Sequence, residues 1–149
     1  MLRINRQTDY ALRVVLALAQ KKVGTRVATK TIGRTMSIPQ NFLPRIVAKL
    51  AQSKIITTFP GRNGGLELAH APEKITLRDV VEAFEGPLLL SECMLDNDFC
   101  PFEANCVIRT RWARLQNVIL EELALTTFLD LAKEANAGSP LISIESITT

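Results

Sequence analysis

Apolar side chains recur at helical spacing along the first third of the chain. Over residues 7–20 they fall at i, i+3, i+4, i+7 and i+8, which predicts one face of an amphipathic helix. The members of this stripe are Ala11, Val14, Val15, Leu18 and Ala19. A short second helix is predicted over residues 28–35, with Ile32 facing inward.

A third apolar stripe predicts the second helix of a helix-turn-helix. Its members are Phe42, Leu43, Ile46, Val47 and Leu50. Ser37 is a candidate N-cap for this helix, with Pro39 in the first turn. Pro44 would remove a backbone hydrogen bond from the helix interior. The helix is therefore either kinked there or regular only from about Leu43 onward.

The pattern then changes from helical spacing to strict alternation. Residues 55–59 are rich in β-branched side chains, and Leu66 and Leu68 flank a polar residue as in a half-buried strand. Between them, Asn63-Gly64 is a strong hairpin signal because both residue types tolerate positive φ. A two-stranded hairpin after a helix-turn-helix predicts a wing, with Arg62 at its tip.

Two more helices are predicted in the second half of the chain. Thr76 and Asp79 have the spacing of a capping box, and Gly86-Pro87 ends the first of these helices. The second, over residues 107–132, repeats apolar side chains at 4-3-4 spacing, in Ile108, Trp112, Leu115 and Ile119. It carries more apolar surface than one small domain covers, which favours packing against a second copy over packing on its own domain.

Charge is distributed unevenly along the 149 residues. Residues 1–65 hold twelve lysines and arginines but a single acid, Asp9, so their formal charge is +11. Residues 66–149 hold six basic and fourteen acidic residues, a formal charge of −8. Each phosphate contact releases counterions and adds affinity, so this segregation favours a nucleic-acid partner over a merely solvated basic surface.

Other features of the composition exclude several classes of protein. Apolar residues make up 47% and aromatics 5%, which favours an aliphatic, helical core. No apolar run approaches the roughly 20 residues that span a bilayer, and the charged N-terminus lacks the apolar stretch of a signal peptide. A cytoplasmic protein without membrane contact is expected. An enzyme is not expected, because there is no phosphate-binding glycine loop, no HExxH, and one histidine, His70, without an evident nucleophile partner.

All the cysteines lie in residues 87–106, which we call the thiol segment. They are Cys93, Cys100 and Cys106. Long loops with weak structural signals are usually functional or disordered. In a reducing compartment, three soft thiolates at this spacing favour an iron–sulfur cluster or another metal. Zinc, a thiol switch and three unrelated cysteines are the alternatives that spacing leaves open.

In combination, these motifs resemble one bacterial regulator family, that of IscR, NsrR and RirA, and most closely its NsrR-like members. The resemblance runs from about Leu2 to Leu131 and is strongest in "TDYALR" at 8–13, "GRNGGLELA" at 61–69 and the three cysteines. It implies a mostly α-helical fold with a small β-hairpin. The expected parts are a winged helix-turn-helix domain (1–86), a cluster-binding loop (87–106), a dimerisation helix (107–135) and a tail (136–149).

The resemblance also implies a cofactor and its ligands. In the family, three cysteines hold an iron–sulfur cluster, and they map onto Cys93, Cys100 and Cys106; a 4Fe–4S cluster is preferred here over 2Fe–2S. IscR-like members add a histidine three residues after the last cysteine, where this chain has Arg109. NsrR-like members add the carboxylate of the "TD" motif from the partner subunit, which corresponds to Asp9. The other interpretation of this carboxylate is a favourable interaction with the helix dipole.

The function implied is that of a homodimeric DNA-binding repressor. It would sense nitric oxide, redox state or iron through the integrity of the cluster, and it would bind a pseudo-palindromic operator. The alternative is a zinc- or thiol-based regulator without an iron–sulfur cluster. The residues expected at the DNA are Gln40 and Asn41 at base edges, Arg45 and Lys49 at phosphates, and Arg62 and Asn63 at the wing tip.

Overall fold

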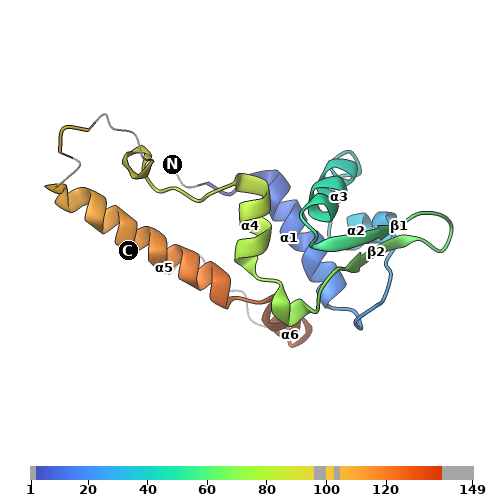
Figure 1. Cartoon of the computed structure of the whole chain (residues 1–149). Helices are drawn as coiled ribbons and strands as arrows, with labels where there is room; N and C mark the ends of the chain where they lie inside the picture. Colours follow the sequence, from blue (N-terminus) through green and yellow to red (C-terminus); the bar gives the residue numbers. More distant parts are fainter. Residues whose placement is uncertain (1–2, 96–99, 103–104, 139–149) are drawn as a thin grey trace.

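The structure, a computed structural model, describes residues 3–95, 100–102 and 105–138. The described chain is mostly α-helical with one small hairpin, as predicted (Figure 1). Its elements in order are α1 (Arg6–Ala19), α2 (Thr29–Thr35), α3 (Leu43–Gln52), β1 (Ile56–Phe59), β2 (Gly65–Leu68), the 3-10 turn η1 (Pro72–Lys74), α4 (Leu77–Glu85), the 3-10 turn η2 (Glu92–Met94), α5 (Val107–Leu125) and α6 (Phe128–Asn136).

Helix α1 lies at the centre of the fold because its apolar stripe is covered from several sides. Asn5 caps the helix, and its side chain accepts a hydrogen bond from the Thr8 N–H at 2.9 Å. The predicted stripe is buried in the core together with Tyr10. Helices α3, α4 and α6 and strand β2 all contact α1. We call α1–α4, the hairpin and α6 the head.

For the turn between α2 and α3, the sequence predicted Ser37 as an N-cap and a helix that is either kinked at Pro44 or regular from about Leu43. Ser37 has a φ of 53°, in the left-handed region, so it does not cap α3, and that prediction was wrong. The helix begins at Leu43 with Pro44 in its first turn, where a proline removes no intrahelical hydrogen bond. The alternative of a helix that is regular from Leu43 is therefore confirmed. Gly33 of α2 lies so close to Leu43 that an added methyl group would be 2.7 Å from its Cδ1.

The wing is an antiparallel hairpin in which Ile56 pairs with Leu68 and Phe59 pairs with Gly65. Residues 60–64 connect the strands, so a two-residue turn at Asn63-Gly64 is not formed. The positive φ angles occur instead at Gly61 (93°) and Gly65 (147°). The hairpin was predicted correctly, but the residues that bend it were not.

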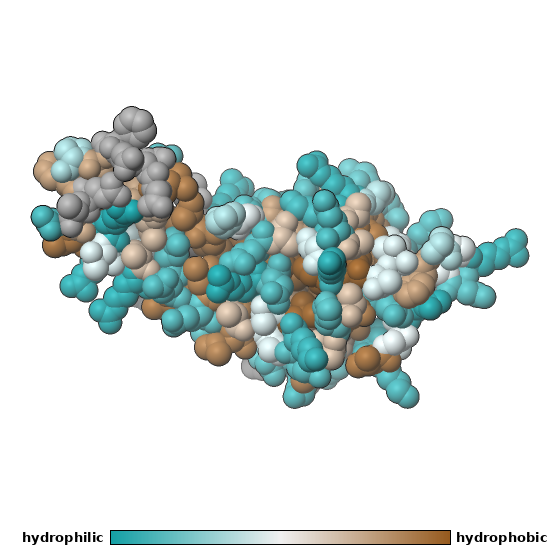
Figure 2. Space-filling model, in the orientation of Figure 1, coloured by the Kyte–Doolittle hydropathy of each residue, from teal (hydrophilic) through white to brown (hydrophobic). Residues whose placement is uncertain are grey.

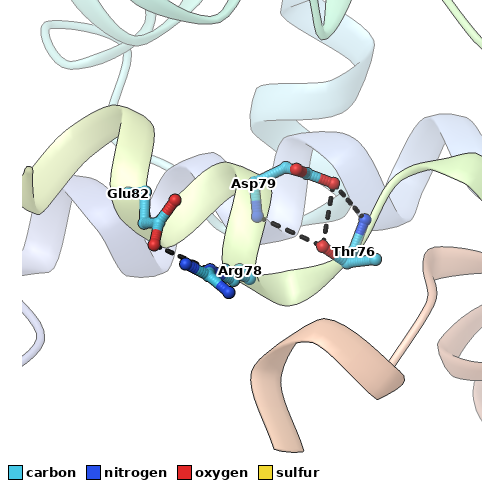
Figure 3. A network of polar contacts seen from close by, with 4 residues as sticks. All are labelled: Thr76, Arg78, Asp79 and Glu82. Atoms are coloured by element: carbon cyan, nitrogen blue, oxygen red, sulfur yellow. Dashed lines mark hydrogen bonds and ion pairs between the residues drawn. The ribbon is translucent and has the colours of Figure 1, made fainter. Parts of the chain in front are cut away.

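Helix α4 is closed at both ends by local sequence signals. The Thr76 hydroxyl accepts a hydrogen bond from the Asp79 N–H, and the Asp79 carboxylate accepts one from the Thr76 N–H at 2.7 Å (Figure 3). Arg78, in the same first turn, pairs with Glu82 one turn later at 2.7 Å. Gly86, with φ of 77°, follows the last residue of the helix. The predicted capping box is confirmed.

The predicted helix over residues 107–132 is in fact two helices, and the second returns to the head. Helix α5 ends at Leu125, and Thr127 caps α6 by accepting a hydrogen bond from the Asp130 N–H. Phe128 is fully buried, and its N–H donates to the Ile75 carbonyl at 2.9 Å. The prediction of one helix was wrong because the chain turns after Leu125 and α6 then buries Phe128 and Ala132 in the core of the head. Residues 139–149 of the expected tail lie outside the described residues.

Candidate nucleic-acid interface and thiol segment

Three of the residues expected at DNA lie exposed around the start of α3. Gln40 and Asn41 lie in the turn that precedes the helix, and Arg45 lies in its first turn. The Gln40 amide nitrogen is 2.8 Å from the position that a methyl group on Gly33 would occupy, so the Gln40 side chain lies beside α2. Side chains at the N-terminal end of a recognition helix are those that reach base edges in a major groove.

A groove of about 690 Å³ separates α3 from the wing. One wall is formed by Pro44, Val47, Ala48 and Ala51 of α3, and the opposite wall by the hairpin from Thr58 to Arg62. The start of α2, at Ala28 and Thr29, also lines it. Arg62 and Asn63 are exposed at the wing tip. The fold therefore brings Arg62 and α3 to the two sides of one groove.

Lys49 is placed differently from the other expected DNA contacts. Its ammonium donates to the Phe84 carbonyl at the end of α4, at 3.2 Å, and lies 5.0 Å from the centre of the Phe84 ring. The side chain is half-buried between α3 and α4. Its hydrogen bond thus ties α3 to α4.

A polar cluster between α1 and α4 has no counterpart in the sequence predictions. Glu85, the last residue of α4, accepts hydrogen bonds from the Asn5 N–H at 2.9 Å and from the hydroxyl of Thr8, which is completely buried. A carboxylate at the N-terminal end of a helix also interacts favourably with the helix dipole. Asn5 could have been recognised as an N-cap, but its partner lies 80 residues away, so no local pattern reveals the cluster.

Asp9 lies in the first turn of α1 and is half exposed. Its carboxylate pairs with Arg13 at 2.8 Å. The same Arg13 donates to the Met36 carbonyl, at the end of α2, at 3.3 Å. Asp9 also borders a hollow of about 440 Å³ formed by Arg3, Ile4, Asn5 and Arg6. An exposed carboxylate that gives up its ion pair with one arginine is able to bind a cation instead. Through Arg13, Asp9 is also connected to the turn of the helix-turn-helix.

The three cysteines follow α4 in the sequence. Cys93 lies in η2 and Cys106 at the start of α5, and these two elements lie at the end of the molecule opposite the wing (Figure 1). All three are free thiols; Cys93 and Cys100 are exposed, and Cys106 is half-buried. Cys93, in η2, lies 3.0 Å from the Ser91 hydroxyl. Cys106 caps α5, and its Sγ accepts a hydrogen bond from the Arg109 N–H at 3.4 Å. The N-terminal end of a helix favours a negatively charged group, so this position suits a thiolate ligand.

Nothing in the described part of the chain brings these groups together into a metal site. Across residues 3–95, 100–102 and 105–138, no three histidine, cysteine, aspartate or glutamate side chains lie close enough to share a metal ion. His70 borders two surface hollows beside the hairpin and contributes to no such group. The donors present are nevertheless soft, reduced and accessible, which is the chemistry that an iron–sulfur cluster or zinc requires.

Helix α5 has no buried residue within the single chain. Its exposed apolar side chains include Ile108, Trp112, Leu115 and Val118, with exposed fractions between 39% and 61%. Figure 2 shows apolar side chains exposed among polar ones over this part of the surface. Three of the four residues of the predicted 4-3-4 stripe are among them. No helix in the described ranges is long and apolar enough to cross a membrane.

Known proteins match this chain in sequence along most of its length. The Rrf2 family, described as "Iron-dependent Transcriptional regulator", matches residues 4–134. Protein rrf2 of Nitratidesulfovibrio vulgaris is 30% identical over 135 residues, which cover 91% of this chain and 90% of that protein. The HTH-type transcriptional regulator NsrR of Halalkalibacterium halodurans is 33% identical over 133 residues, which cover 89% and 86%.

Solved structures of related proteins share the fold. CymR of Bacillus subtilis, described as a global cysteine regulator, matches with a TM-score of 0.75 and 28% identity over 89% of this chain and 98% of that one. IscR of T. potens matches in fold with a TM-score of 0.73 and 23% identity over 97% and 96%. The resemblance to NsrR-like regulators is confirmed, and this chain belongs to the Rrf2 family of DNA-binding transcriptional regulators.

Proposed function

We propose that the protein is a homodimeric repressor that holds an iron–sulfur cluster and releases its operator when the cluster is lost. The observation that carries this proposal is the grouping of three free thiols, Cys93, Cys100 and Cys106, in the segment between α4 and the first residue of α5. In the molecule, η2 and the start of α5 lie at the end opposite the wing of the basic head (Figure 1). This separation is expected of a sensor joined to an effector.

The head is proposed to bind DNA through α3 and the wing. Gln40 and Asn41 would reach base edges, where amide side chains suit adenine, and Arg45 would meet phosphates. Arg62 and Asn63 would bring the wing tip to the backbone or the minor groove. For Lys49 we propose a different role from the phosphate contact that the sequence predicts, because its ammonium is bound to α4.

Cys93, Cys100 and Cys106 would hold the cluster, with Asp9 of a second copy as the fourth ligand. The position of Arg109 argues against an IscR-type histidine ligand, and the exposed Asp9 carboxylate favours the NsrR-type set. When bound, such a cluster, 4Fe–4S in preference to 2Fe–2S, supplies a centre that nitric oxide, oxygen or iron shortage can dismantle. Ligation by Asp9 would weaken its ion pair with Arg13.

Dimerisation is proposed to use the exposed apolar face of α5. Ile108, Trp112, Leu115 and Val118 remain uncovered within one chain, and a helix this exposed is most simply completed by the same helix of a second copy. A two-fold dimer would present two recognition helices and would therefore bind a pseudo-palindromic operator. It would also bring the Asp9 of one subunit toward the thiol segment of the other.

Two contacts would carry the state of the cluster to the head. The first is the end of α4, which holds the recognition helix through Lys49 and the start of α1 through Glu85, immediately before the thiol segment begins. The second is Arg13, which joins Asp9 to the carbonyl of Met36 beside the helix-turn-helix turn. Loss of the cluster would free Asp9 and the thiol segment, and both contacts would then shift the recognition helix.

A specific observation also favours a second candidate, a thiol-based regulator without a cluster. Cys93 is exposed and lies 3.0 Å from the Ser91 hydroxyl, so it is open to oxidants. The structural likeness to CymR, described as a cysteine regulator, adds to this candidate. In this alternative the exposed thiols would sense oxidants or small thiols directly.

Protein purified without air separates the two candidates. A cluster protein is expected to be coloured, with absorbance at about 400–460 nm, and to contain iron and sulfide. Binding to an operator duplex would then be measured for the cluster-loaded and cluster-free protein, with nitric oxide, oxygen and chelator added separately. A colourless, iron-free protein that binds the operator as tightly as a reconstituted sample would refute the proposal.

Asp9 is tested in the same assay with Asp9→Ala and Asp9→Asn. Both variants remove the charged ligand, and Asp9→Asn keeps the size of the side chain. If Asp9 is a ligand, both variants should change the cluster spectrum and lose the response of operator binding to nitric oxide. A parent-like spectrum and response in both variants would show that the fourth ligand is a different group.

A further inference from the structure

Arg26, in the connection between α1 and α2, contacts both strands of the wing. Its guanidinium carbon lies 3.6 Å from the centre of the Phe59 ring, at the end of β1. Its Nε lies 3.6 Å from the Glu67 carboxylate, in β2. Stacking on an aromatic face and pairing with a carboxylate both suit the planar guanidinium and suit a lysine ammonium less well.

The two wing residues that Arg26 contacts lie on the same face of the hairpin. Side chains alternate between faces along a strand, so Phe59 and Glu67 point away from the face that carries Ile56 and Leu66. Ile56 and Leu66 are buried in the core of the head. Arg26 therefore covers the outer face of the wing, while the core supports its inner face.

Backbone contacts fix the same segment to the hairpin. Val27 and Leu66 exchange two hydrogen bonds, of 2.8 and 2.9 Å, as in a third strand of the sheet. Gly65, opposite Phe59, has φ of 147°, and a methyl group on it would lie 2.6 Å from the Val27 carbonyl oxygen. Only a glycine allows this close approach. Residues 26–28 are thus joined to β2, and α2 begins at the next residue.

We propose that Arg26 is a positioning residue for DNA binding, which sets the angle at which the wing tip faces the groove beside α3. An isolated two-stranded hairpin is marginally stable in water, so the direction of residues 60–64 depends on what holds the hairpin. Arg26 supplies that restraint on the outer face, close to the turn that carries Arg62. Its own charge is partly neutralised by Glu67, which makes it a poorer phosphate ligand than Arg62.

The test separates positioning from direct contact by changing the ring as well as the arginine. The probe is a duplex that the wild-type protein selects from a random-sequence library, with a non-selected duplex of equal length for comparison. In Phe59→Leu the charge of Arg26 remains but the stacking is lost, and in Arg26→Lys the charge remains but the planar group is lost. Both changes should weaken binding to the selected duplex by about 3- to 10-fold.

A double-variant cycle with Arg62→Ala gives the decisive measurement. If the wing is misdirected by Arg26→Lys, Arg62 no longer reaches its contact, so Arg62→Ala should cost less affinity in the Arg26→Lys background than in wild type. Arg78→Lys is the matched control, since Arg78 is an exposed arginine paired with a glutamate on α4, away from the wing. It should leave affinity unchanged, and circular dichroism should show all variants folded.

Two results would overturn the proposal. Parent-like affinity in both Phe59→Leu and Arg26→Lys, with loss only in Arg26→Ala, would make Arg26 a direct phosphate contact. Fully additive effects of Arg26→Lys and Arg62→Ala would show that Arg26 does not act through the wing tip. A wild-type protein that selects no duplex would instead refute the DNA-binding role on which the proposal rests.

Discussion

The burial of Phe128 makes α6 a part of the head, and this gives a quantitative prediction for stability. Phe128 is completely buried among the core residues of α1 and neighbouring elements, and it follows directly after the break between α5 and α6. Phe128→Ala would remove the ring and leave a cavity in this core. Truncation of a buried phenylalanine costs about 3–5 kcal/mol, a large fraction of the roughly 5–15 kcal/mol that stabilises a domain.

The assay is equilibrium unfolding in urea, followed by circular dichroism. For a slope of about 2 kcal/mol/M, a loss of about 4 kcal/mol lowers the midpoint by about 2 M. Phe102→Ala is the matched control, because Phe102 is 73% exposed and its truncation should change the free energy of unfolding by less than about 0.5 kcal/mol. Measurements at several protein concentrations separate this effect from any change in dimerisation.

This prediction fails if Phe128→Ala lowers the free energy of unfolding by less than about 1 kcal/mol, far below the range for a buried aromatic ring. It also fails if Phe102→Ala destabilises the protein as much as Phe128→Ala does. The first result would mean that α6 does not fill the core in solution, and the second would mean that the loss does not depend on the burial of the ring.

The remaining predictions concern packing, assembly and signalling. Gly33→Ala would place a methyl group 2.7 Å from a buried leucine, so the start of α3 should shift. We expect the free energy of unfolding in urea to fall by about 1–3 kcal/mol and operator binding to weaken. Parent-like values of both would show that the turn adapts. Trp112→Glu should convert the dimer to monomer in analytical ultracentrifugation, while Arg114→Glu should not; a dimeric Trp112→Glu protein would place the interface elsewhere. Lys49→Met should reduce the difference in operator affinity between the cluster-loaded and cluster-free protein without changing the salt dependence. A salt slope that falls by about 1 would instead make Lys49 a phosphate contact.

Local signals in the sequence predicted most of the elements correctly. The capping box of Thr76 and Asp79 acts over three residues, and the alternation around Leu66 and Leu68 reflects one buried face, so both are visible without knowledge of the fold. The break between α5 and α6 also has a local signal in the sequence. Thr127 and Asp130 have the same capping spacing as Thr76 and Asp79, and this spacing marks the start of α6.

The features that the sequence analysis did not predict arise from contacts between segments that are distant in the sequence. Lys49 has the spacing of a solvent-facing residue on α3, but α4 arrives beside it and offers a free carbonyl at the C-terminal end of a helix. Glu85 has no local signal because its partners, Asn5 and Thr8, precede it by 80 and 77 residues in the sequence. The thiol positions were evident from the sequence, whereas the proposed fourth ligand, Asp9 of a second copy, rests on the family resemblance and not on a contact within one chain.

The path of the chain around α4 has a functional consequence. The segment from Gly86 to Leu125 departs from the C-terminal end of α4, and the chain returns to its N-terminal end, where the Leu77 N–H donates to the Thr126 carbonyl at 3.0 Å. These two ends are about 13 Å apart along a nine-residue helix. The head is therefore formed by the segments before and after residues 86–125, which are inserted between α4 and α6. Under the proposed function, changes in the length or ligands of that insertion would alter the sensing part and leave the contacts within the head, including those of α3 and the wing, in place.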